Sequence, residues 1–124
     1  MATKIKEAEV RIDPVKITDN ETGTTYILDF NRESVMFAEA RGFDTELLVK
    51  FPVSNFPDFL FYALRANHKN IARNQSDKLY ERLGGYSPEF LERLLQLYNQ
   101  AAFANNIVEA TEEMGKNGNL TVEL

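Results

Sequence analysis

The sequence predicts an α+β fold, in which an N-terminal β-hairpin packs on a mainly α-helical body. Two observations lead to this prediction. The first thirty residues place β-branched and aromatic residues on both sides of a turn, and the rest has apolar residues at helical spacing between capping residues. A chain of 124 residues fits one domain. We expect a hairpin region (1–30), a helical body (31–114) and a flexible C-terminal segment (115–124).

The predicted hairpin has two strands and a polar turn. Apolar residues from Val10 to Ile17 are spaced for the first strand, and Pro14 interrupts it as in an edge strand or a bulge. Asp19–Gly23 has the composition of a turn, and Thr24–Phe30 (TTYILDF) is β-branched and aromatic. Because a lone hairpin is only marginally stable in water, we expect helices to cover one of its faces.

Two short helices are predicted next. Asn31 can cap a helix that runs to Arg41, and Gly42 can end it. Asp44 or Thr45 can begin a second helix, which should stop before Pro52 because the residue preceding a proline disfavours helical backbone.

The stretch FPVSNFPDFLFYALRA (residues 51–66) predicts an aromatic helix, capped by Asn55 with Pro57 in its first turn. Its main apolar face should consist of Phe56, Phe59, Leu60, Ala63 and Leu64. Phe61 and Tyr62 would point elsewhere, so the helix should be covered on more than one side. That cover is either the protein's own core or partly another protein.

Two further helices complete the predicted body. Ser76 is expected to cap a short helix (SDKLYERL) that ends at Gly84, and Ser87 with Pro88 marks the start of the last helix. The apolar pattern of the last helix weakens after Asn105. The segment 115–119 reads as a spacer, and Leu120–Leu124 could add a short edge strand or remain loose.

The sequence shows no signature of an enzyme or a metal site. There is no cysteine, and the one histidine, His68, lies in a hydrophilic segment (NHKN) without a recognisable nucleophile motif. The late cluster Glu109, Glu112 and Glu113 has no histidine near it in sequence and predicts a solvated face. We therefore expect no catalytic residue, no cofactor and no metal.

Composition restricts the location and the partners. The net charge is −5, which argues against nucleic acid as the main partner, because phosphate binding relies on concentrated Lys and Arg. The densest basic stretch, Arg65–Lys78, leaves single-stranded nucleic acid as a minor alternative. No segment approaches the roughly 20 apolar residues that span a bilayer, so we expect a cytoplasmic protein without a membrane partner.

Four segments resemble one family of small phage proteins. They are FNRESVMFAEARGFD (30–44), LFYALRANHKNIAR (60–73), DKLYERLGGYSPEFLERLLQLYNQ (77–100) and the terminal TVEL (121–124). In this order they resemble the tail assembly chaperones of long-tailed phages and prophages of Gram-positive bacteria, many of which are known as domains of unknown function.

The resemblance implies a non-enzymatic role in the host bacterial cytoplasm. Such chaperones are thought to bind the long, aggregation-prone tape-measure protein, keep it soluble and help to recruit tail tube subunits. In many phages a ribosomal frameshift near the end of the gene yields a longer form, and this chain would then be the shorter one. Self-association would also suit a long client.

An apolar groove for a client helix should be built from the two longest helices. Our candidate partner-binding residues are Phe59, Phe61, Tyr62, Leu64, Tyr98 and Phe103. Each could equally be an ordinary core residue, a reading we favour for Phe59 and Leu64, whereas Phe61 and Phe103 lie off the main stripes of their helices. An adaptor that binds another host or phage protein remains an alternative.

Overall fold

The computed structural model describes residues 12–103 and confirms the predicted α+β fold, with a hairpin followed by helices. In chain order the elements are β1 (Val15–Asp19), β2 (Thr24–Leu28), α2 (Arg32–Ala40), α3 (Thr45–Lys50), α4 (Pro52–Arg65), α5 (Arg73–Leu83) and α6 (Pro88–Phe103). The predictions for Val10, for Asn105 and the acidic cluster, and for the segments 115–119 and 120–124 lie outside the described residues.

The hairpin pairs its two strands in antiparallel register, from Val15 opposite Leu28 to Asp19 opposite Thr24. Its turn closes as the sequence predicted, because Gly23 adopts a positive φ of 77° and donates its N–H to the Asp19 carbonyl at 2.7 Å. Pro14 precedes the first strand and does not interrupt it.

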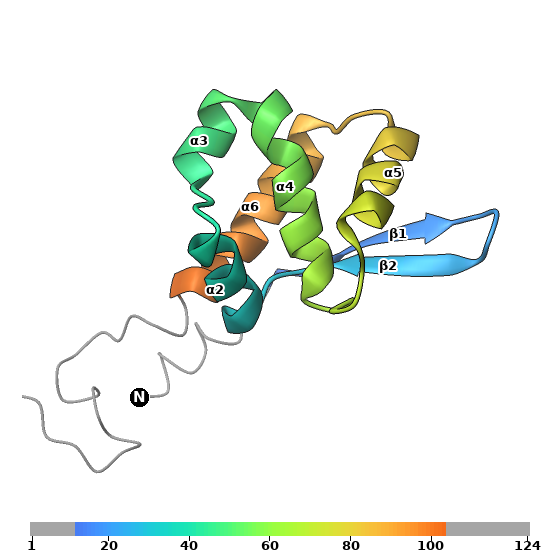
Figure 1. Ribbon diagram of the computed structural model, residues 1–124, viewed down its shortest axis with the longest axis horizontal. Coiled ribbons are helices and arrows are strands. Elements are labelled where there is room, and N and C mark those ends of the chain that lie inside the picture. The colour runs from blue at the N-terminus through green and yellow to red at the C-terminus, as the bar shows by residue number, and fades with distance from the viewer. Residues whose placement is uncertain (1–11, 104–124) are drawn as a thin grey trace, which may run out of the picture.

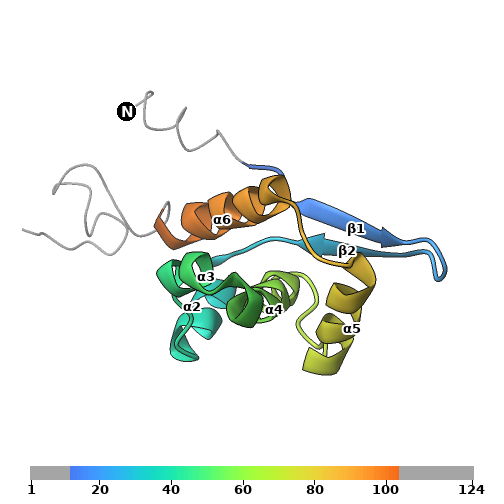
Figure 2. The ribbon, with the colours of Figure 1, turned by 90° about the horizontal axis from the view of Figure 1, so that it is seen from above.

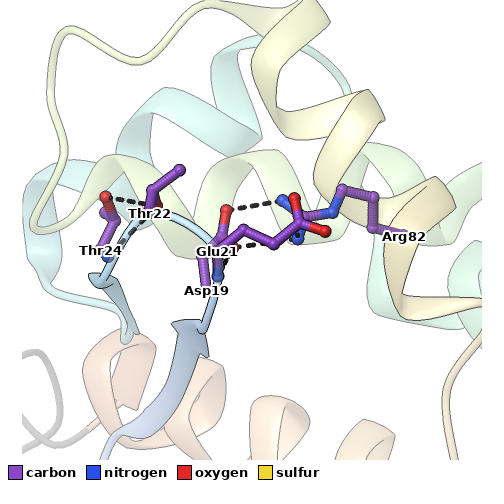
Figure 3. A network of polar contacts seen from close by, with 5 residues as sticks. All are labelled: Asp19, Glu21, Thr22, Thr24 and Arg82. Atoms are coloured by element: carbon purple, nitrogen blue, oxygen red, sulfur yellow. Dashed lines mark hydrogen bonds and ion pairs between the residues drawn. The ribbon is translucent and has the colours of Figure 1, made fainter.

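Contacts from distant parts of the chain fix the hairpin on the helical body. At the outer edge of β2, the Ile27 N–H donates to His68 Nε2 at 3.0 Å and the Asp29 N–H donates to the Ala63 carbonyl at 3.1 Å. At the turn, the Asp19 carboxylate accepts from the Arg82 guanidinium of α5 (Figure 3). The N–H groups of Ile27 and Asp29 are thus satisfied by a loop histidine and by a carbonyl of α4.

The segment after β2 runs through the middle of the molecule, between α6 and the other helices (Figures 1 and 2). Leu28, the last residue of β2, is fully buried, and Phe30, in the segment that follows, is 5% exposed. The Phe30 ring stacks on Phe59 of α4, with 5.2 Å between centroids, and meets Tyr98 of α6 edge-on at 5.1 Å. This segment therefore joins the helices into one hydrophobic core.

The first two helices begin and end as predicted. The Asn31 side chain accepts from the Ser34 N–H at 2.8 Å at the start of α2, and Asp44 accepts from the Glu46 N–H at 2.8 Å at the start of α3. Between them Gly42, with φ of 81°, ends α2 and lets the Phe43 N–H reach the Ala38 carbonyl at 3.1 Å.

The aromatic helix buries the predicted face but begins earlier than predicted. Phe56, Phe59, Leu60, Ala63 and Leu64 are all fully buried, which confirms the predicted face. The start at Asn55 was wrong, since α4 begins at Pro52 and includes Pro57. A proline suits the first helical position, and the Asn55 amide donates to the Phe51 carbonyl at 2.9 Å and does not cap.

The prediction that Ser76 caps the next helix was also wrong. Helix α5 begins at Arg73, and Gln75 Oε1 accepts from the Ala72 N–H at 2.9 Å at its start. Ser76 thus lies one turn inside the helix. It is fully buried, and its hydroxyl has no hydrogen-bond partner among the described residues.

Replacing Ser76 by alanine is expected to raise the free energy of unfolding by about 1 kcal/mol, because the desolvation penalty of the unpaired hydroxyl disappears. Alanine also has the higher helix propensity. Urea denaturation followed by circular dichroism would measure the change. Loss of stability in Ser76→Ala would instead show that the hydroxyl makes a stabilising contact.

The start of the last helix follows the prediction, since Pro88 begins α6 and the Ser87 hydroxyl accepts from the Phe90 N–H at 3.1 Å. Its buried side includes Leu94, Leu97 and Tyr98. Among residues 12–103, none of the helices combines the length and the apolar character needed to cross a membrane.

Candidate functional site

A pocket of about 610 Å³ lies where the end of α2, the start of α3 and the end of α6 come together. We call it the α2–α6 pocket. Its apolar lining includes Phe43, Tyr98, Ala102 and Phe103, and its polar lining includes Glu39 and Asp44. An apolar cavity with a few polar groups at defined positions is the usual form of a binding site.

Local sequence signals build this pocket. Gly42 turns the chain at the end of α2, so that Phe43 points back into the core, where its ring stacks on Phe59 with 5.1 Å between centroids. Phe43 also meets the Tyr98 ring at 5.5 Å. Asp44 then starts α3, so its carboxylate remains beside the aromatic lining.

The pocket carries negative charge. Within residues 12–103, neither Glu39 nor Asp44 forms an ion pair with a cationic side chain. Burial, together with the charges of Glu39 and Asp44, raises the pKa of Tyr98 to about 12, so the phenol is neutral at physiological pH. The pocket therefore presents aromatic rings, one protonated phenol and two carboxylates.

A second surface feature adjoins the pocket through α3. Four apolar side chains between residues 47 and 53 are exposed, by 42% for Leu47, 65% for Val49, 54% for Phe51 and 82% for Val53. We call these four residues the apolar ridge. Helix α3 begins beside the pocket, and the ridge starts within this helix at Leu47 and continues beyond its end to Val53.

Two of the six predicted partner-binding residues lie at this site. Tyr98 is 6% exposed and lines the pocket wall, and Phe103 is 54% exposed at the pocket. Phe59 and Leu64 are fully buried in the core, as favoured for both from the sequence. The structure thus places Tyr98 and Phe103 in the pocket lining, whereas the four α4 residues do not line it and Phe59 packs behind Phe43 and Tyr98.

The remaining two, Phe61 and Tyr62, belong to an aromatic cluster between α2 and α4. Tyr62 is buried and Phe61 is half-buried, and both rings meet Phe37, with centroids 5.8 and 6.2 Å away. Arg41 and Arg65 place their guanidinium carbons 3.5 and 3.9 Å from the Phe37 ring centroid. Two guanidinium groups cannot share one face at these distances, so they sandwich the ring.

One family model, described as a domain of unknown function (DUF5055), matches residues 1–124. The chain belongs to the DUF5055 family. Searches of curated proteins and of solved structures found no significant match. The family description assigns no activity, so the arrangement of side chains has to indicate the function.

The basic stretch of this DUF5055 chain is largely occupied by internal contacts. Arg73 pairs with Asp58 at 2.8 Å and with Asp77 at 2.9 Å, and Lys69 pairs with Glu33 at 3.2 Å. Arg65 stacks on Phe37. Carboxylates beside Lys69 and Arg73 lower the positive potential on which phosphate binding relies.

His68 has a structural contact in this member of the family. Its Nε2 accepts the Ile27 N–H, and its ring lies 5.7 Å from Tyr26. It borders a second pocket of about 430 Å³, whose lining also includes Lys69, already paired with Glu33. In the part of the chain that the structure describes, no three metal-ligating side chains form a group that could hold an ion.

Sequence reasoning missed the apolar ridge and the carboxylates of the pocket in this DUF5055 protein. One signal could have found the ridge: the run LLVKFPV (47–53) has more apolar residues than a six-residue helix can bury. Glu39 gave no signal, because a single acidic residue on the exposed face of a helix is common. Its significance comes from Phe43 and Tyr98, which the tertiary fold brings beside it.

Proposed function

We propose that this chain is a non-enzymatic chaperone of phage tail assembly, which binds the tape-measure protein and keeps it soluble during tail morphogenesis. Its place of action would be the host bacterial cytoplasm. The observation that carries the proposal is the apolar ridge, where four large apolar side chains within seven residues are exposed by 42–82%. Several large apolar side chains exposed within one short segment favour a surface that another protein covers.

The chemistry of the α2–α6 pocket supports binding of a helix. Phe43, Tyr98 and Phe103 offer apolar and aromatic contacts beside an exposed ridge, and a helix-in-groove complex uses anchors of this kind at successive turns. We name the tape-measure protein as the client because residues 30–44, 60–73 and 77–100 resemble tail assembly chaperones. The tail tube protein would be a secondary partner.

Co-expression with the long helical protein encoded next to this chain tests the proposal. We expect that protein to be insoluble alone, and to be soluble and co-elute with this chain in size-exclusion chromatography. The chromatogram of the chain alone would report its self-association. If the long protein stays insoluble, or is soluble and elutes separately, the chaperone proposal fails and the adaptor alternative takes its place.

Substitution of the apolar ridge should identify the contact surface. Phe51→Ser with Val53→Ser is expected to abolish co-elution, because it removes two exposed apolar contacts of the ridge while the core is unchanged. Met36→Ser is the matched control, since Met36 is 58% exposed on α2 outside the ridge. Equal losses from the ridge variant and the control would argue against the ridge as the contact surface.

A further inference from the structure

The α2–α6 pocket combines two properties that rarely favour the same ligand group. Its aromatic rings, Phe43, Tyr98 and Phe103, favour an apolar occupant. Its carboxylates, Glu39 and Asp44, favour a cation, and among residues 12–103 no lysine or arginine lines the pocket. A group that satisfies both must have an apolar body and a positively charged end.

Both carboxylates are free to bind such a cation. Within residues 12–103, Glu39 forms no ion pair, and the bonds of the Asp44 carboxylate are limited to the capping bond from the Glu46 N–H. A carboxylate has about four lone-pair directions, so one capping bond leaves Asp44 able to accept further. Their charges also reach the pocket interior, where they act on the phenol of Tyr98.

We propose that the α2–α6 pocket binds a lysine or arginine side chain that projects from an amphipathic helix of the partner protein. The aliphatic stem lies on Phe43 and Phe103, and the charged end lies between Glu39 and Asp44. The identity of that partner as the tape-measure protein rests on the proposed function, but the specificity for a basic helix rests on the pocket itself.

General chemistry favours this occupant over the alternatives. Long basic side chains bury their methylene stems on apolar surface and keep the charge at a polar rim, and aromatic faces attract cations as well. An acidic side chain would be repelled by both carboxylates, and a purely apolar one would leave them next to apolar groups without a cation.

The position of the apolar ridge relative to the pocket predicts how far the apolar stripe of the partner helix lies from its basic residue. Phe51, the ridge residue that follows the end of α3, is about 9 Å along the helix axis from Thr45, which lines the pocket. The partner helix therefore has an apolar stripe about two turns away from the basic residue. This spacing defines a sequence pattern that can be searched for in any candidate client.

The test uses synthetic helical peptides of about 18 residues with a leucine stripe, measured by fluorescence anisotropy. One peptide has lysine two turns from the stripe, a second has norleucine there and a third has glutamate. We expect the lysine peptide to bind the full-length chain about ten-fold more tightly than the norleucine peptide, and the glutamate peptide to bind least.

Two matched double variants distinguish the effect of the pocket carboxylates on peptide binding from the effect of the protein's net charge. Glu39→Gln with Asp44→Asn removes two charges and retains the helix cap, because asparagine caps as well as aspartate. It should abolish the ten-fold preference for lysine. Glu81→Gln with Glu92→Gln removes two exposed carboxylates elsewhere and should preserve that preference. Circular dichroism would verify that both variants are folded.

Two results would overturn the inference: equal binding of the lysine and norleucine peptides, or equal loss of preference in the two charge variants. These outcomes are separate from failure of the proposed function. If the long helical protein co-elutes but the peptides are not discriminated, the pocket inference fails alone. If the lysine peptide binds through Glu39 and Asp44 but the long protein does not co-elute, the chaperone proposal fails alone.

Discussion

Replacement of Phe59 by alanine is expected to lower the free energy of unfolding by about 3–5 kcal/mol. Phe59 is fully buried, and its ring meets Phe30, Phe43, Phe56 and Tyr98 with centroids 5.1 to 6.3 Å away. Its removal therefore takes away apolar burial and leaves a cavity between α4, α6 and the segment after β2. A loss of this size is a large share of the roughly 5–15 kcal/mol that stabilises a domain.

Urea denaturation at pH 7, followed by circular dichroism, would measure this loss. Phe103→Ala is the matched control, because the same side chain is 54% exposed at the end of α6 and its truncation should change stability by about 0.5 kcal/mol or less. A loss below about 1 kcal/mol in Phe59→Ala would show that the aromatic cluster is not the stabilising core.

Replacement of Asp19 by asparagine is expected to destabilise the fold clearly at pH 7 and much less at acidic pH. The Asp19 side chain is only 4% exposed. Its two oxygens accept from the Arg82 guanidinium at 2.6 and 3.0 Å, and Oδ1 also accepts from the Glu21 N–H at 3.0 Å (Figure 3). Asparagine has no charge and one oxygen fewer, so it cannot accept both guanidinium bonds.

The pH dependence of the stability follows from the direction in which folding shifts the pKa of Asp19. The hydrogen bonds from Arg82, above all, hold the pKa of the Asp19 carboxyl well below its usual range. A carboxyl whose pKa is lower in the folded state contributes stability that is fully present above its unfolded pKa of about 3.9. That contribution is lost as pH falls through the folded pKa, because protonation removes the charge.

Unfolding free energies at pH 7 and near pH 2 would test this directly. The difference between the wild-type chain and Asp19→Asn should be large at pH 7 and should shrink as pH falls below about 4. Lys69→Gln is the control, since the Lys69–Glu33 pair is exposed at both ends and should contribute little at either pH. If the difference in unfolding free energy between the two chains does not change with pH, the charge of Asp19 does not contribute to stability.

Local signals explain the elements that were predicted correctly. Asn31, Asp44 and Ser87 each cap the helix that the sequence assigned to them, and Gly23 and Gly42 turn the chain with positive φ. Each feature depends on backbone geometry and on side chains within three or four residues. Such features are visible in one sequence because their physical cause is local.

The two helix starts that were predicted wrongly lie in segments with more than one possible N-terminal signal. Asn55 and Ser76 are both good caps, but Pro52 and Arg73 begin the helices. The residues added by the earlier starts are mostly exposed, Val53 by 82%, so burial of these residues does not explain the starts. The observed starts have local signals of their own, because proline suits the first helical position of α4 and Gln75 accepts from the Ala72 N–H at the start of α5. Alternative caps of this kind differ by only about 1 kcal/mol.

The candidate site was only partly accessible from the sequence. Tyr98 and Phe103 were predicted as partner-binding residues from their positions on the last helix, and both line the α2–α6 pocket. Glu39 and Asp44 were not predicted for that role. They lie more than fifty residues from Tyr98 in the chain, so only the packing of α6 against α2 gives them a common function.

By itself, the sequence determined the α+β class, the hairpin turn, most of the helix caps and the buried face of α4, because periodicity and capping act over one or two turns. Only the tertiary structure decided which apolar residues remain exposed, such as Val49 and Val53, and which carboxylates meet aromatic rings. Exposure and electrostatic environment depend on neighbours from distant segments, and in this protein the chain brings those neighbours together only when α2, α3 and α6 pack around Phe43.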